Sequence, residues 1–141
     1  MTTVVALRPH TQAVLQALGG LGDTGVYDGK GPASPHEHVP YIVVRPYLPR
    51  YDGPTADIAA DVDYRVTLAC AGTSQAMTED TADRARVALL DPAAALAPVG
   101  RLMRGPVTYE TLRSCLQDED PLLVTPMWTV LDLYTIPTTP G

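Results

Sequence analysis

Three glycines have the spacing with the most specific chemical meaning. Gly20, Gly22 and Gly25 match the Gly-x-Gly-x-x-Gly fingerprint of dinucleotide-binding proteins. In that motif the glycines follow a strand and open a helix, so that the helix N-terminus meets a pyrophosphate. Here a helical apolar pattern precedes the glycines and a β-rich run follows them. Because this order is reversed, we interpret the segment as a loop that ends a helix, and we expect no cofactor.

His36, Glu37 and His38 could contribute ligands to a metal ion. A zinc site needs three or four protein ligands, and neither a third histidine nor a cysteine lies near these residues in the sequence. We therefore interpret them as loop residues and expect no metal.

The remaining reactive side chains do not form a recognisable catalytic motif. Cys70 belongs to an alternating strand pattern that points it inward, and a buried thiol in apolar surroundings is inert. The sequence pairs neither Cys70 nor Cys115 with a histidine, and it has no Gly-x-Ser-x-Gly elbow or Walker loop. Solvated loops and strand faces account for the many carboxylates. We therefore expect a protein that is not an enzyme.

Two helices are expected to hold the chain together. Pro9 suits a first helical turn, the apolar residues after it recur at helical spacing as far as Leu18, and Gly19 then ends the pattern. A second helix is expected from a cap at Thr73 or Ser74 to Leu90, before Asp91-Pro92.

Four strands are expected in addition. A β-rich run covers 41–44, strict alternation covers 62–71, and weaker patterns cover 107–112 and 127–134. The order α-β-β-α-β-β predicts an α+β fold with one mostly antiparallel four-stranded sheet and two helices on one face. We expect a single domain over residues 1–135 and an extended C-terminal tail over 136–141.

Size and charge limit the function. A chain of 141 residues fits one domain. Its formal net charge of -6 argues against a nucleic-acid-binding surface. No signal peptide or membrane span is evident, so we expect reduced cysteines and a cytoplasmic location.

The segment 46–60 is a long loop between two strands, and loops of this length are usually functional. Tyr47 and Tyr51 lie on it, and tyrosines on loops often anchor protein interfaces. We take these two residues as candidates for a partner contact.

The ordered features resemble a known family. They are Val26-Tyr27-Asp28-Gly29, Pro40-Tyr41-Ile42-Val43-Val44, the strand ending Ala69-Cys70-Ala71-Gly72, the helix 82–90 and the strand 128–134. Together they are similar to the tail terminator, or tail completion, proteins of long-tailed bacteriophages, over roughly residues 11–135.

The resemblance implies a structural virion protein at the neck-proximal end of the tail. Such proteins form a ring of six on the last ring of the tail tube, stop its polymerisation and join the tail to the head-neck connector proteins. The implied partners are further copies of the chain, the major tail tube protein and those connectors, while DNA passes through the lumen without specific binding. Under this reading Asp52, Asp57 and Asp61 are candidates for the lumen or the tube contact, since acidic side chains repel DNA.

Two alternatives remain open. A head-tail adaptor or stopper would also form a ring but would bind the portal side. A small α+β ligand-binding or enzyme domain would need a pocket with converging polar groups.

Overall fold

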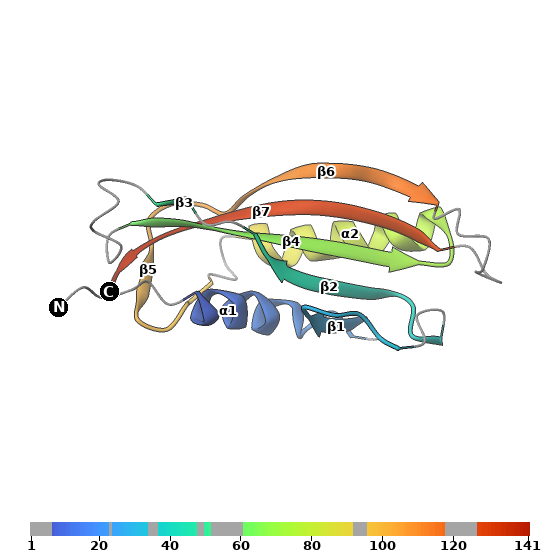
Figure 1. The fold of residues 1–141 in the computed structure, drawn as a ribbon, viewed down its shortest axis with the longest axis horizontal. Helices are drawn as coiled ribbons and strands as arrows, with labels where there is room; N and C mark the ends of the chain where they lie inside the picture. Colours follow the sequence, from blue (N-terminus) through green and yellow to red (C-terminus); the bar gives the residue numbers. More distant parts are fainter. Residues whose placement is uncertain are drawn as a thin grey trace.

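The chain was analysed as a computed structural model, which describes residues 7–22, 24–33, 37–47, 50–51, 61–91, 96–117 and 127–141. Two helices and seven strands occur in these ranges, in the order α1 β1 β2 β3 β4 α2 β5 β6 β7 (Figure 1). The helices are α1 (Arg8–Leu18) and α2 (Gln75–Leu90). The strands are β1 (Gly25–Asp28), β2 (Tyr41–Pro46), β3 (Arg50–Tyr51), β4 (Val62–Gly72), β5 (Arg101–Met103), β6 (Thr108–Gln117) and β7 (Trp128–Pro140).

Both helices form where the sequence predicts them. Pro9 lies in the first turn of α1, where its missing N–H and fixed φ cost nothing. The side chain of Ser74 caps α2 by accepting a hydrogen bond from the backbone N–H of Met77 (3.1 Å). Such a cap contributes about 1 kcal/mol to helix stability.

The sheet differs from the prediction. Its order is β1-β2-β4-β7-β5, with β3 also paired to β4 and β6 also paired to β7. The pair β1–β2 is parallel, and all the others are antiparallel. The predicted four-stranded, mostly antiparallel sheet in the order α-β-β-α-β-β is therefore wrong: the sheet is mixed and has seven strands.

The missed strands are short and lack a periodic pattern. β1, β3 and β5 have four, two and three residues, too few to show an alternation of period two. Each exists because a longer strand provides a hydrogen-bonded edge for it: β1 joins β2, β3 joins β4, and β5 joins β7.

β7 also extends further than the predicted strand 127–134, through residues 136–140 of the segment that was expected to be an extended C-terminal tail. Pro137 does not break it, although proline lacks a backbone N–H. Its carbonyl accepts a hydrogen bond from Arg104 N (2.9 Å), so the backbone of Pro137 points toward Arg104, just past the end of β5, and away from β4. The missing N–H therefore removes no hydrogen bond between β7 and β4.

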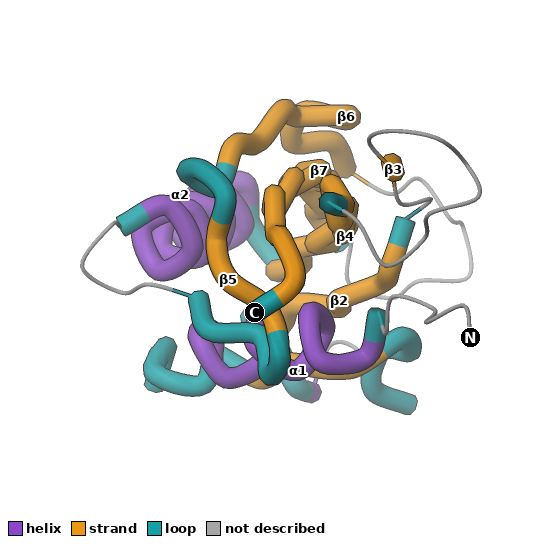
Figure 2. The backbone as a smooth tube through the Cα atoms, turned by 90° about the vertical axis from the view of Figure 1, so that its left-hand side faces the viewer, coloured by secondary structure: helices purple, strands orange, loops and turns teal. Residues whose placement is uncertain are grey.

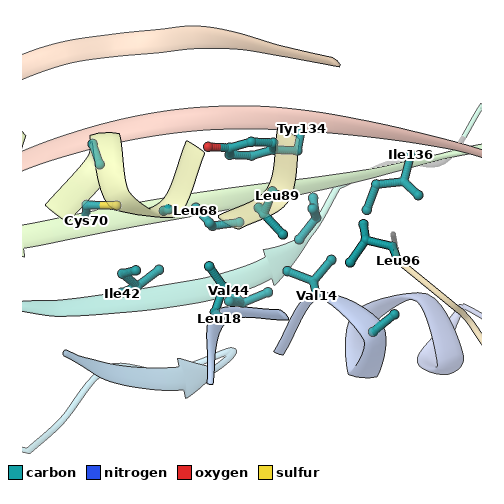
Figure 3. Close-up of a cluster of buried hydrophobic side chains, with 14 of the residues drawn as sticks. Val14, Leu18, Ile42, Val44, Leu68, Cys70, Leu89, Leu96, Tyr134 and Ile136 are labelled. Atoms are coloured by element: carbon teal, nitrogen blue, oxygen red, sulfur yellow. The ribbon is translucent and has the colours of Figure 1, made fainter. Parts of the chain in front are cut away.

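One face of the sheet packs on both helices. Inward residues from β4 and β7 lie opposite one another in register, as in the pairs Tyr64↔Ile136 and Val66↔Tyr134. Figure 3 shows Tyr134 and Ile136 converging with side chains from α1, α2 and β2. The buried members include Val14, Leu18, Ile42, Val44, Leu68, Cys70, Leu89 and Leu96. This layer is the hydrophobic core.

Buried polar side chains join α1 to the sheet. Thr11 Oγ1 and Tyr64 OH form a hydrogen bond, and the ring of His10 stacks on that of Tyr64 with the ring centroids 5.0 Å apart. His10 Nε2 and Thr138 Oγ1 are hydrogen-bonded at 2.8 Å. These contacts connect the first helix to the last strand.

The sheet is strongly curled. Viewed along its long axis, β6 lies at the top, β7 and β4 in the centre and β2 below, with α2 to one side (Figure 2). The curl carries β6 over toward α2, so that one edge strand faces a helix. This arrangement positions the candidate site.

Candidate interaction surface

β6 is the most exposed long element in the described part of the chain. Nine of its ten residues are exposed, and Cys115 is half-buried. Among the described residues, β6 pairs with β7 alone, so its other side is an open sheet edge. Open edges carry unpaired backbone N–H and C=O groups that can pair with another chain.

Exposed apolar side chains concentrate along this edge. Among the described residues, five of the seven large hydrophobic side chains that are exposed lie between positions 99 and 116, on β5, β6 and the turn before β5. They are Val99, Leu102, Tyr109, Leu112 and Leu116. They follow the β5 and β6 side of β7, from Leu102 opposite Thr139 to Leu116 opposite Thr129. We take this edge as the candidate interaction surface, because a second chain that paired with it would cover both the unpaired backbone groups and these side chains.

A buried ion pair between α2 and β7 also contacts β6. Arg86 on α2 donates from Nε to Asp132 Oδ2 (2.9 Å) and from Nη2 to Asp132 Oδ1 (3.2 Å). Thr111 on β6 donates to the same carboxylate (2.9 Å). The guanidinium also lies 5.1 Å from the centroid of the Tyr109 ring. Since Asp132 is buried, these contacts balance a charge that would otherwise be costly.

A cleft of about 430 Å³ opens between α2 and β6. Its polar lining comprises Glu79, Asp83, Arg86, Thr111, Ser114 and Cys115. The guanidinium of Arg86 is engaged with Asp132, Asp83 and Thr111, and the hydrogen bond to Asp132 is the main reason why its pKa is raised. The exposed carboxylates of Glu79 and Asp83 therefore dominate the mouth of the cleft.

The two cysteines differ in how deeply they are buried. Cys70 is buried in the core, where burial raises the pKa of its thiol to about 12. Cys115 is half-buried in the cleft, and burial followed by the charge of Glu79 raises its pKa. Both shifts disfavour the reactive thiolate. The inward position predicted for Cys70 is confirmed.

The sequence matches no protein-family model and no curated protein. Within the ranges that the structure describes, no three His, Cys, Asp or Glu side chains are grouped as a metal site would require. None of the described helices has the length and apolarity needed to cross a membrane.

The glycines of the dinucleotide-like spacing lie where the sequence places them, between a helix and a strand. α1 ends at Leu18, and Gly25 is the first residue of β1. Glu37 and His38 are exposed, while His36 lies outside the described residues.

The predicted contact residues flank the first half of β4. Tyr47 is exposed, its N–H donates to Arg65 O (2.8 Å), and its ring centroid lies 4.8 Å from the Arg65 guanidinium carbon. Tyr51, which belongs to β3, pairs with Val62 of β4. Asp61 lies 3.6 Å from Arg104 in an ion pair. Asp52 and Asp57 are outside the described residues.

Sequence reasoning missed the Arg86–Asp132 pair and the edge formed by β6. One signal for the pair was present. Asp132 interrupts an apolar strand at a position that the alternation places inward, and a lone inward carboxylate requires a cationic partner. Nothing in the sequence indicated which arginine this would be.

Proposed function

We propose that this protein is a structural, ring-forming subunit of a long-tailed bacteriophage tail, acting as its tail terminator. The observation that carries the proposal is the open edge of β5 and β6 with the exposed apolar side chains that follow it. An edge of this kind suits permanent assembly, because pairing with another chain would cover both the apolar side chains and the unpaired backbone groups. The resemblance of the ordered sequence features to tail terminators supplies the biological setting.

Ring formation follows from simple geometry. A contact between two different surfaces of the same chain, repeated by rotation, closes into a ring when the rotation divides a full turn. The proposed ring has six members, caps the tail tube, stops tube growth and offers its other side to the head-neck connector proteins. Its lumen lets DNA pass without specific binding. In this proposal the ring resides in the virion tail after assembly in the host cytoplasm.

A head-tail adaptor or stopper is the nearest alternative, and it would use the same open edge. A ligand-binding or enzymatic role draws on a different observation, the cleft between α2 and β6. That cleft is less suited to a small ligand, because Arg86 already directs its hydrogen bonds to Asp132, Asp83 and Thr111. Binding pockets instead direct a few polar groups toward the ligand.

The first experiment measures mass in solution by light scattering over a range of concentrations, with negative-stain images of any large species and of tail tubes mixed with the protein. We expect rings of about six subunits, either free or at tube ends. A variant with Leu112→Glu and Leu116→Glu should lose them, while Val87→Glu should keep them, because Val87 is exposed on α2 away from the edge. A wild-type protein that stays monomeric and leaves tube ends uncapped contradicts the proposal.

A further inference from the structure

The cleft beside β6 carries an excess of negative charge. The carboxylates of Glu79 and Asp83 line it, and the charge of the guanidinium that lines it, Arg86, is balanced by the buried carboxylate of Asp132 behind the cleft. Arg113, also on β6, does not compensate them: it donates to Thr129 Oγ1 (2.9 Å), and neither Arg113 nor Thr129 lines the cleft. A cationic partner would therefore be attracted to the mouth of this cleft.

A basic patch lies on the opposite face of the sheet. Tyr64 and Val66 point into the core, so Arg65, which lies between them on β4, points outward. Tyr47 lies directly opposite Arg65, and Arg45 is two residues from Tyr47 and therefore on the same face. We call Arg45, Tyr47 and Arg65 the basic patch.

The two arginines of the basic patch contact neutral groups. Arg45 is exposed and donates to Gly29 O (2.8 Å), a neutral acceptor, and no carboxylate in the described part of the chain is paired with it. Arg65 covers the ring of Tyr47, which is also neutral. Asp63, the carboxylate that β4 itself carries on that face, is paired with Arg104.

We propose that the basic patch of one copy docks onto the acidic cleft and β6 edge of a second copy. Within one molecule the two surfaces lie on opposite faces of the sheet, so neither can satisfy the other. Between copies they are complementary in charge, since Arg45 and Arg65 of one copy would meet Glu79 and Asp83 of the next. The contact joins two different surfaces, so it propagates head to tail as a ring requires. The inference rests on the proposed function for its closure into a ring, but the contact itself can be tested separately.

Cys115 provides a natural probe, because it is half-buried in the cleft while Cys70 is buried in the core. In the Tyr47→Cys variant each copy has one thiol in the patch and one in the cleft. Mild oxidation should give a reducible ladder of disulfide-linked species beyond the dimer, since every subunit can bond to two neighbours. The ladder should be absent from Tyr47→Cys/Cys115→Ser, which has no thiol in the cleft. It should also be absent from Val87→Cys, whose new thiol is at an exposed position of α2 outside the patch.

Charge reversal gives an independent measurement. Glu79→Lys alone and Arg45→Glu/Arg65→Glu alone should each reduce the ladder of the Tyr47→Cys protein more than about tenfold, because like charges across an interface cost several kcal/mol. An equal mixture of the two charge-reversed proteins should regain cross-linking, since each reversed surface then meets one of opposite charge.

Three results would overturn the inference. Wild-type protein that forms only Cys115–Cys115 dimers would assign β6 to a two-fold contact. Duplex DNA binding that is lost in Arg45→Glu/Arg65→Glu would assign the patch to nucleic acid. Rings that form without any cross-link from Tyr47→Cys would leave the proposed function standing and exclude this contact. Conversely, a ladder from a protein that neither closes into rings nor caps tubes would support the contact and contradict the tail-terminator proposal.

Discussion

Arg86 on α2 and Asp132 on β7 form a two-point ion pair, with Nε to Oδ2 at 2.9 Å and Nη2 to Oδ1 at 3.2 Å. The carboxylate is buried, while the arginine side chain retains 23% of its exposure. The same arginine lies over Tyr109 and reaches Thr111, so this pair connects the helix, the central strand and the edge strand. The pair thus adds a side-chain connection to β6, whose backbone is already held by its pairing with β7.

Removal of the arginine is expected to destabilise the fold strongly. Arg86→Ala should lower the free energy of unfolding by about 3–5 kcal/mol, because it leaves Asp132 buried without its cationic partner. Urea denaturation measures this. Asp83→Ala is the matched control: Asp83 contacts the same arginine but is 69% exposed, so its loss should stay within about 1 kcal/mol. Adding Asp132→Asn to Arg86→Ala should recover part of the loss. If Arg86→Ala and Asp83→Ala lowered the free energy of unfolding equally, the ion pair between Arg86 and Asp132 would not stabilise the fold.

Two tyrosine-to-phenylalanine substitutions should have opposite effects. Tyr64→Phe removes the hydrogen-bond partner of buried Thr11 and should cost about 1 kcal/mol. Tyr134→Phe removes a buried hydroxyl that has no hydrogen-bond partner among the described residues, so stability should be unchanged or should rise by up to about 1 kcal/mol. Thermal and urea unfolding of both variants provide the comparison. A large loss in Tyr134→Phe would mean that its hydroxyl is satisfied.

Gly72 is expected to tolerate no side chain at the end of β4. A Cβ there would lie 2.8 Å from Thr78 Oγ1 and 3.0 Å from two atoms of Met77, in the first turns of α2. Gly72→Ala should therefore cost about 1–3 kcal/mol through overpacking. In Gly20→Ala the new Cβ would meet nothing within 4 Å, and stability should stay the same or rise slightly. If both substitutions were neutral in chemical denaturation, the close approach of β4 to α2 would be disproved.

Stability should fall in alkaline solution. Burial, followed by the charge of Asp132, raises the pKa of Cys70 to about 12, whereas an unfolded cysteine titrates near about 8.5. Between these two pKa values the thiol is ionised in the unfolded protein and protonated in the folded protein, which favours unfolding. The stability that comes from the protonated thiol is therefore complete below about pH 8.5 and is lost progressively toward pH 12. Burial also raises the pKa values of Tyr41, Tyr64 and Tyr134, which adds to the loss at higher pH.

The measurement is the free energy of unfolding at a series of pH values from neutral to about 10. Cys70→Ala should be less stable at neutral pH but should show a flatter decline above about pH 8.5. Cys115→Ala, at a half-buried position, should change the slope less. A decline that is identical in wild type and Cys70→Ala would assign the alkaline sensitivity to other groups.

The sequence by itself determined the elements that have a local pattern. The alternation from Val62 to Cys70 specified β4 and its inward face, because a one-residue slip would expose every core side chain. Pro9 and Ser74 specified where α1 and α2 begin, since capping depends on immediate neighbours. The inward position of Cys70 follows from the same alternation.

Tertiary structure decided the rest, because those features depend on pairing between distant segments. β1, β3 and β5 are strands only where a longer strand offers an edge, and Pro137 is tolerated because its backbone points away from β4. Arg86 and Asp132 are 46 residues apart, and the packing of α2 on β7 brings them together. The acidic cleft and the basic patch are arrangements of the same kind, since local sequence sets the orientation of each side chain and only the folded sheet sets which ones become neighbours.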